Sequence, residues 1–258
     1  MHCWLIPRLC GIWVKCLVTD FVFLHGGGQG GWVWDETIAA LIAQAGAGAH
    51  RTLALDGPGC GTKRGRDTGE IGFDAITAEL VSDIEAAGLA DVVLVGHSQA
   101  GTHMPVMVAL RPGLFAKLIY VSCIAPDPGL TTIEMTGTRI HGGKHPFTDT
   151  TLSVRNRYRQ MFCNDMGAEQ QEAFLDKLGS DQWPPSCYQH TDWRYDHLAD
   201  VPSHYVLCLE DAILPLAWQQ RFAERFHCRS VTRIDAGHQA MNTRPQALAE
   251  VLLAQAAA

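Results

Sequence analysis

Residues 92–101 read VVLVGHSQAG, in which four β-forming residues run directly into a turn that carries Ser98. A helical pattern follows from Gly101 to Leu110, so the serine stands where a strand turns sharply into a helix. Such a turn is called a nucleophile elbow, because its strained backbone holds the serine hydroxyl above the edge of the sheet. The turn needs small residues two positions before and after the serine. Gly96 and Ala100 stand there, and the alanine departs from the glycine of the strict pattern.

Short apolar runs alternate with longer helical patterns along most of the chain. This alternation is typical of β-α-β units, so we predict an α/β fold with a mostly parallel sheet and helices on both faces. The strands are expected at residues 21–24, 52–55, 92–95, 118–121, 204–209 and 230–234, and the helices at residues 34–44, 73–87, 101–110, 218–226 and 245–255. The carboxyl ends of parallel strands share one edge, where folds of this kind bind their ligands.

The alternation breaks in the middle of the chain, where helices expected at 152–162 and 168–178 join irregular pieces rich in aromatic residues. We interpret this segment as a cap inserted into the core, lying as a lid over a pocket. The predicted organisation is an N-terminal arm (1–19), a first part of the core (20–126), the cap (127–200) and a second part of the core (201–258).

The N-terminal arm is apolar but is interrupted by Arg8, Gly11 and Lys15. No small-residue cleavage site follows it, so it fits a signal peptide poorly. Its apolar runs are far shorter than the roughly 18 residues of a membrane-spanning helix. We therefore expect no membrane association, and an arm that packs poorly or adds a strand.

The composition of the 258 residues, 47% hydrophobic and 18% charged, fits a globular domain and excludes disordered and collagen-like chains. The net charge is −7 and no basic run occurs, so nucleic acid is not an expected partner. Nine cysteines form an odd, scattered set without a C-x-x-C pair. This pattern predicts reduced thiols in a cytoplasmic protein.

A serine nucleophile needs a base, and the base needs an acid that holds its tautomer. His238 follows the strand at 230–234 and is the predicted base, because that strand ends at the same edge as the elbow. For the acid we prefer Asp211 to its neighbour Glu210, which still follows the alternation of the preceding strand. Asp235 also competes, although its place at the strand end favours a structural role.

A glycine-rich turn follows the first predicted strand and reads HGGGQGGW at residues 25–32. Its glycines leave backbone N–H groups free to face an anion, as an oxyanion hole requires. We predict the N–H of Gly27 and the N–H of Gln99, the residue after the serine, as the two donors.

The same turn has a rival interpretation as a dinucleotide-binding loop. Gly26, Gly28 and Gly31 can be read as G-x-G-x-x-G, and Asp56 stands at the end of the next strand, where such sites carry an acidic residue. This alternative explains neither the serine turn nor His238. The phosphate-binding pattern G-x-x-x-x-G-K-[ST] is absent.

Four motifs in order resemble those of the α/β-hydrolase superfamily, and the resemblance runs from about residue 20 to the end. They are HGGGQGGW (25–32), LDGPGCG (55–61), VGHSQAG (95–101) and DAGHQAMNTRP (235–245). The first motif and the cap are similar to the branch that holds plant methyl esterases, hydroxynitrile lyases and related bacterial esterases. The resemblance implies a cap after the strand at 118–121, a cofactor-free Ser-His-Asp triad of Ser98, His238 and Asp211, and an oxyanion hole of Gly27 and Gln99.

Two positions bear on the chemistry within that branch. The hydroxynitrile lyases carry a threonine directly after the histidine of the glycine turn and a lysine directly after the catalytic histidine, whereas this sequence has Gly26 and Gln239. Cyanide elimination needs a cation near the leaving anion, and Gln239 cannot supply one. The resemblance therefore favours ester hydrolysis, with a lyase-like enzyme or a small-molecule receptor that keeps the fold as alternatives.

The resulting hypothesis is a carboxylesterase that cleaves small to medium, fairly hydrophobic esters through an acyl-enzyme. No cofactor and no metal is expected, the expected partner is a small-molecule ester, and the sequence leaves a homodimer open. Besides the aromatic residues of the cap, the residues expected to line the substrate pocket are His25, Gly26, Trp32, His97 and Met104.

Overall fold

The computed structural model describes residues 18–144 and 149–258. Its described strands form one parallel sheet in the order β2-β1-β3-β4-β5-β6. The strands are β1 (Thr19–Leu24), β2 (His50–Leu55), β3 (Val92–His97), β4 (Phe115–Val121), β5 (Ser203–Cys208) and β6 (Ser230–Ile234). Each lies where the sequence predicts a strand, so the α/β fold with a parallel sheet is confirmed.

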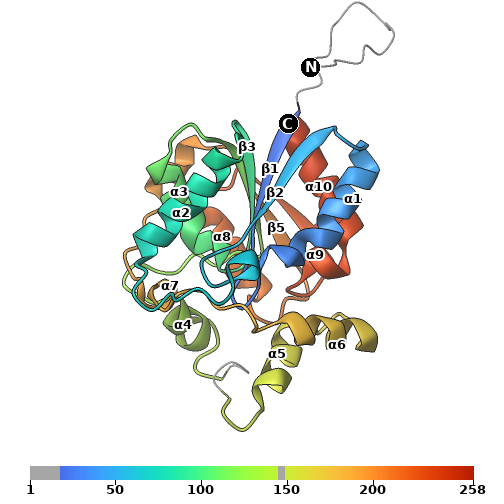
Figure 1. Ribbon diagram of the computed structural model, residues 1–258. Helices are drawn as coiled ribbons and strands as arrows, with labels where there is room; N and C mark the ends of the chain where they lie inside the picture. Colours follow the sequence, from blue (N-terminus) through green and yellow to red (C-terminus); the bar gives the residue numbers. More distant parts are fainter. Residues whose placement is uncertain (1–17, 145–148) are drawn as a thin grey trace, which may run out of the picture.

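Helices cover both faces of this sheet (Figure 1). One face carries α1 (Asp35–Ala45), α9 (Ala240–Thr243) and α10 (Pro245–Ala257), and the other carries α2 (Phe73–Ala86), α3 (Ala100–Leu110) and α8 (Leu216–Arg225). Two single 3₁₀ turns, η1 (Gly31–Trp34) and η2 (Gly61–Lys63), lie in the loops after β1 and β2. The five long helices of the core were predicted, and their ends differ from the prediction by at most two residues.

The sheet separates two hydrophobic cores. Successive side chains of a strand point to opposite faces, so a strand buried on both sides is apolar throughout. In β1, Phe21 and Phe23 pack with the side of α1 and α10, while Val22 and Leu24 pack with the side of α2 and α3. All four side chains are fully buried. This rigid sheet fixes the positions of the loops that follow its strands.

The described part of the chain between β4 and β5 leaves the sheet and lies at the carboxyl ends of the strands, below the sheet in Figure 1. It forms α4 (Thr132–Glu134), the π-helix η3 (Met135–Ile140), α5 (Val154–Phe162), α6 (Ala168–Lys177), α7 (Ser186–Gln189) and η5 (Asp196–Asp200). The sequence predicts α5 and α6 but not the shorter helices, because so few residues do not display a helical period. We call this segment the cap; its exact limits at 127 and 200 and its role as a lid stay predictions.

The N-terminal arm predicted at residues 1–19 falls, up to residue 17, outside the described residues. Thr19 already belongs to β1, which therefore begins two residues before the predicted strand. Within residues 18–144 and 149–258, no helix has the length and apolar character needed to cross a membrane.

Candidate active site

Ser98 occupies the sharp turn between β3 and α3. Its φ angle is +53°, a left-handed conformation that is costly for a residue with a side chain. The turn is held by flanking backbone bonds: the N–H of Ser98 donates to the Val121 carbonyl, and the Ser98 carbonyl accepts from Gly101 and Ile124. The strain is therefore supported by β4 and by the first turn of α3, and the elbow predicted from the sequence is present.

Ala100, which departs from the strict elbow pattern, fits because Gly96 has no side chain. A Cβ at position 96 would lie 3.0 Å from the Ala100 methyl and would collide with the sulfur of Met104. Ala100 and Met104 are both fully buried. The methyl group therefore fills space beneath the turn and leaves the backbone of Ser98 in its strained conformation.

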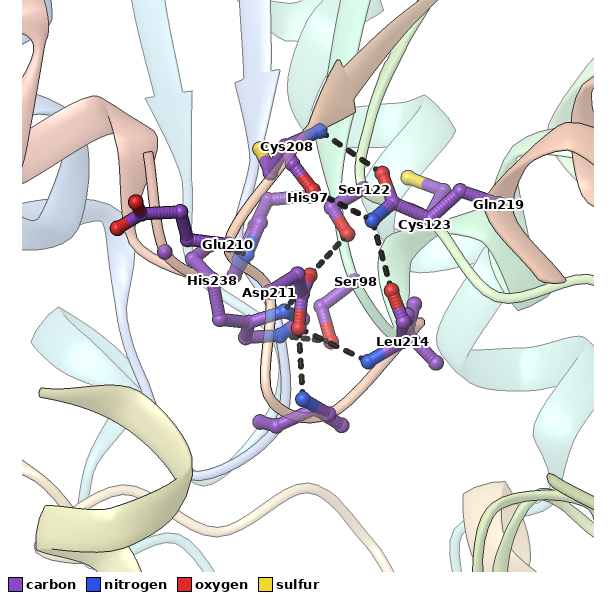
Figure 2. A network of polar contacts seen from close by, with 12 residues as sticks. His97, Ser98, Ser122, Cys123, Cys208, Glu210, Asp211, Leu214, Gln219 and His238 are labelled. Carbon is purple, nitrogen blue, oxygen red and sulfur yellow. Dashed lines mark hydrogen bonds and ion pairs between the residues drawn. The ribbon is translucent and has the colours of Figure 1, made fainter. Parts of the chain in front are cut away.

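A chain of hydrogen bonds joins the serine to a histidine and a carboxylate (Figure 2). The Oγ of Ser98 lies 2.9 Å from Nε2 of His238, and Nδ1 of His238 lies 2.6 Å from Oδ2 of Asp211. With the Nδ1 proton donated to the carboxylate, Nε2 is left with a lone pair that accepts the serine O–H. This is the tautomer that a general base needs.

Asp211, rather than Glu210 or Asp235, lies against the histidine. Figure 2 shows Glu210 pointing away from the ring of His238, and both Glu210 and Asp235 are exposed to solvent. The second oxygen of Asp211, Oδ1, accepts the N–H groups of Ile213 at 2.7 Å and Leu214 at 2.8 Å. The carboxylate is therefore fixed by its own loop and aimed at the ring.

Two residues that the sequence analysis did not identify brace this acid. Ser122, directly after β4, donates its hydroxyl to Oδ2 of Asp211. Gln219 on α8 is fully buried and bonds both backbone groups of Cys208 and the carbonyl of Leu214, which encloses the turn around Asp211. Ser122 could have been found as a polar residue at a strand end on the same edge. Gln219 has no such signal.

The backbone of His238 is held by His97, the residue before the serine. Nε2–H of His97 donates to the His238 carbonyl at 2.9 Å, and the two rings pack 4.6 Å apart. Burial, with repulsion from His238, lowers the pKa of His97 well below its usual value. His97 is therefore neutral, and its hydrogen bond fixes the backbone of His238.

The glycine turn after β1 approaches the serine very closely. A Cβ at Gly26 would lie only 2.9 Å from the Cβ of Ser98, so only glycine allows the turn to reach the elbow. The next residue, Gly27, and Gln99 both border the pocket beside Ser98. Within the described part of the chain, neither backbone N–H donates to a protein acceptor. Both donors remain available to an anion at the serine, as an oxyanion hole requires.

Asp56, the residue that supports the rival dinucleotide interpretation, is engaged inside the protein. Its carboxylate accepts the N–H of Gly31 at 2.7 Å and both the N–H and the hydroxyl of Thr62 at 2.8 Å. These bonds lower the pKa of Asp56 although partial burial acts in the opposite direction. The carboxylate ties the glycine turn to the loop after β2 and is not free to hold a ribose.

A pocket of about 600 Å³ opens at Ser98. Its walls are mainly apolar. They come from the glycine turn after β1, the turn that carries Ser98, the loop after Asp211 and the cap. The cap supplies most of the larger side chains, namely Ile133, Tyr158, Met161, Phe162, Leu178, Trp183 and Tyr188. Tyr158, Phe162, Trp183 and Tyr188 are aromatic, as the sequence predicts for the cap.

The other residues predicted to line the pocket lie elsewhere. His25, Gly26, His97 and Met104 are buried beneath the turns, and none of them borders the pocket. His25 accepts the N–H of Gly57 on Nε2, and burial lowers its pKa. Trp32 faces a separate groove against Phe174 and Lys177 and donates its N–H to Asp181. These residues support the site from below or from the side, so their assignment to the pocket wall is corrected.

Comparison with known proteins identifies the family of the chain. The family model described as the alpha/beta hydrolase family matches residues 21–251. The chain belongs to this family. The match includes most of β1, the elbow, the cap and His238, so it covers all residues of the candidate site.

Individual relatives are distant. A pyrethroid hydrolase from Sphingobium wenxiniae is 23% identical over 249 residues, covering 91% of this chain and 86% of that protein. Polyneuridine aldehyde esterase from Rauvolfia serpentina is 22% identical over 252 residues, covering 90% of this chain and 94% of that protein. A solved extracellular alpha/beta-hydrolase from a Paenibacillus species is 18% identical with a TM-score of 0.74, covering 92% of this chain and 98% of the other.

No cluster of three or more His, Cys, Asp or Glu side chains that could hold a metal ion occurs among residues 18–144 and 149–258. The acidic residue that borders the pocket, Asp181, is already engaged: it accepts from Trp32, from the N–H of Gly61 and from Arg64. What the site offers is a polarised hydroxyl, a base and backbone donors.

Proposed function

We propose that this α/β hydrolase cleaves neutral carboxylic esters through an acyl-enzyme on Ser98. The observation that carries the proposal is the continuous chain of hydrogen bonds from Ser98 through His238 to Asp211, at the floor of an open apolar pocket. The relatives named above are hydrolases and esterases, which supports the same reaction class.

Acylation begins when an ester carbonyl lies above Ser98. His238 takes the hydroxyl proton on Nε2, and Oγ attacks the carbonyl carbon. The N–H groups of Gly27 and Gln99 receive the oxyanion, and each such donor contributes about 3 kcal/mol to the transition state in comparable sites. Asp211 stabilises the imidazolium and does not itself take the proton. Collapse of the intermediate transfers the proton from His238 to the leaving alcohol.

Deacylation reverses the roles of the nucleophile and the leaving group. A water molecule enters where the alcohol left, and His238 takes its proton as the water attacks the acyl carbon. The oxyanion forms again at Gly27 and Gln99, and Ser98 leaves as the alcohol with the proton from His238. The acid product and the free enzyme result, and no redox partner is needed.

The pocket favours neutral and fairly hydrophobic substrates of small to medium size. No lysine or arginine lies among the described residues that border it, so a carboxylate or phosphate on the substrate would find no counter-ion. The aliphatic and aromatic side chains of the cap instead bury apolar groups, at roughly 25 cal/mol per Å².

The alternatives of a lyase and a receptor gain no support from this arrangement. Cyanide release would need a cation at the leaving group, and Gln239 in the predicted position is uncharged and fully buried. A receptor only has to bind its ligand, so it does not require that Ser98, hydrogen-bonded to His238, borders the pocket. Cytoplasmic localisation is part of the proposal, supported by free cysteines at the six positions that the structure describes.

The test is hydrolysis of a nitrophenyl butyrate by the wild type and by Ser98→Ala. The wild type should release nitrophenol, and the variant should lose kcat by about a millionfold, to the background rate. Ser82→Ala, an exposed serine on α2, is the matched control and should keep full activity. Turnover by Ser98→Ala would reject Ser98 as the nucleophile. A wild type that releases no nitrophenol but whose melting temperature is raised by small esters would indicate a receptor.

A further inference from the structure

Four consecutive cap residues, from Phe162 to Asp165, wrap around the loops that carry the base and the acid. The ring of Phe162 lies 5.7 Å from the ring of His238 and also borders the pocket. The chain then leaves α5 and turns toward the loop before His238. The end of α5 is therefore in direct contact with the catalytic base.

Asp165 holds the residue before the base. Its Oδ2 accepts the N–H of Gly237 at 2.8 Å, and its side chain is only 3% exposed. Arg244, which follows α9, lies 3.8 Å from the same oxygen and supplies a positive charge. The other oxygen, Oδ1, is buried without a hydrogen-bond partner. Burying a carboxylate with one oxygen unpaired costs folding free energy. An apolar side chain would fill the same space without this cost, so the bond from Gly237 to Asp165 indicates a specific role for the carboxylate.

The contact leaves no room for a side chain at Gly237. A Cβ there would lie 2.5 Å from Oδ1 of Asn164 and 2.5 Å from Oδ1 of Asp165. The backbone of the loop before His238 therefore lies directly against side chains of the cap. The N–H of Gly237 donates to Asp165.

Asn164 makes the corresponding contact with the acid loop. Its side-chain amide donates to the carbonyl of Glu210 at 2.8 Å, one residue before Asp211. The two catalytic loops are also joined directly, because the N–H of Glu210 donates to the carbonyl of Ala236 at 2.9 Å. Two neighbouring cap side chains thus hold the two loops at the residues next to the acid and next to the base.

We propose that Asp165 is a positioning residue for His238, and that Asn164 assists it by holding the loop of Asp211. The inference rests on the proposed function, since it assigns to the cap a part in the same reaction. The cap then does more than cover the pocket: it sets the distance between Nε2 of His238 and Oγ of Ser98. A displacement of about 1 Å in such a group costs about a hundredfold in rate.

The experiment compares Asp165→Ala, Asp165→Asn and the control Asp176→Ala. Asp176 is an exposed cap carboxylate that pairs with Arg155 and contacts neither catalytic loop. Two rates are measured: steady-state hydrolysis of a nitrophenyl ester, and covalent labelling of Ser98 by a fluorophosphonate, which reports the activated hydroxyl without any ester substrate. The melting temperature of each variant is recorded alongside.

Asp165→Ala should lower kcat and the labelling rate by the same factor, about 10- to 100-fold, with KM changed by less than about twofold. Asp165→Asn keeps an oxygen that can accept the N–H of Gly237, so it should recover most of both rates although it has lost the charge. Asp176→Ala should match the wild type. A purely structural role would instead lower the melting temperature and leave kcat per folded molecule unchanged, and this result would overturn the proposal.

A second variant decides the matter if Asp165→Ala does not fold. Asn164 is exposed, so Asn164→Ala should fold, and its kcat should fall about three- to tenfold at constant KM. An unchanged kcat would overturn the proposal. Failure of the proposed function looks different: the wild type would label with the fluorophosphonate but hydrolyse no ester, while the order of labelling rates among the variants would still test Asp165. A wild type that does not label would reject both.

Discussion

The carboxyl edge of the sheet and the cap are built in different ways. At the edge, Ser98, Asp211 and His238 each stand within four residues of the end of a strand, so the buried sheet fixes their positions through short stretches of covalent backbone. The cap has short helices and long connections, and it is attached to the core by side-chain bonds such as those of Asp165 and Asp181. In the proposed function the rigid edge supplies the reacting groups, and the cap supplies most of the larger side chains of the pocket wall.

This difference in construction predicts which property each substitution changes. Changes at the edge should lower kcat for every ester, because they remove groups that act in the transition state. Changes in the cap wall should alter the choice between esters, because they act on parts of the substrate away from the reacting carbonyl. Asp165 is the exception, since its side chain belongs to the cap but contacts the edge.

After Ser98→Ala, the largest effect is expected at the acid. Asp211→Asn removes the carboxylate that holds the His238 tautomer, so kcat should fall about ten-thousandfold for short and long esters alike. Glu210→Gln is the matched control and should stay within about twofold, because that side chain points into solvent. Steady-state kinetics on both esters check this. The reverse order of effects would make Glu210 the acid.

The second effect is on the pH dependence of stability, and it arises at His103, where the core contacts the cap. His103 on α3 is buried between the rings of Phe73 and cap residue Trp183, and its Nε2 lies 3.4 Å from Sγ of Cys187 in the cap. Burial, with repulsion from His25 and His190, lowers the pKa of His103 from 6.5 to about 3. Below pH 6.5 the imidazole of His103 therefore binds a proton in the unfolded chain but stays neutral in the folded chain. The free energy of unfolding falls as the pH falls from 6.5 toward 3.

The size of this loss follows from the shift. Between pH 7.5 and pH 5 it amounts to about 2 kcal/mol of unfolding free energy for His103 alone. Urea unfolding at both pH values should show a smaller difference for His103→Gln than for the wild type, by about this amount. An equal pH dependence in the two proteins would mean that His103 is protonated in the folded state.

A third prediction narrows the pocket from the cap side. Ile133 borders the pocket, and Ile133→Trp should lower kcat/KM for a long-chain nitrophenyl ester about tenfold while the acetate ester is nearly unaffected. Val154→Trp is the control, because Val154 is an exposed cap residue outside the pocket wall. An equal loss of kcat/KM on both esters would contradict this prediction, because it would mean that position 133 affects the reaction itself rather than the choice of ester.

The smallest effect is expected at Ala100. Ala100→Gly restores the strict elbow pattern but leaves space beneath the turn, so we expect activity within about twofold of the wild type. The free energy of unfolding should fall by about 1 kcal/mol, because glycine is a poorer helix former and the buried methyl is lost. A large gain in kcat would show that the methyl distorts the elbow.

The sequence predicted the edge well because its information is local. Ser98 and His238 follow strands that are recognisable as short apolar runs, and Asp211 was chosen over Glu210 by the alternation of a single strand. The structure brings all three together. Ser122 obeys the same rule and was overlooked.

The pocket prediction holds for four cap aromatics but not for the residues near the serine and glycine turns, because residues close in sequence can point to opposite sides of a turn. His97 precedes the serine and Met104 lies in the helix after it, yet both side chains are buried in the core while Ser98 borders the pocket. Tyr158 and Phe162 of the pocket wall come from α5, which the sequence predicts, whereas Trp183 lies in an irregular stretch and Tyr188 in the four-residue helix α7, which show no period. The bond from Asp165 to Gly237 joins residues far apart in sequence.

The central claim is that ester cleavage passes through an acyl group on Ser98, activated by His238. The most direct test is to quench the wild type during turnover of a nitrophenyl ester and to measure peptide masses. The peptide that contains Ser98 should carry the acyl group, and His238→Ala should prevent its formation. Turnover with an acyl group on another residue, or with none at any time after mixing, would contradict the account.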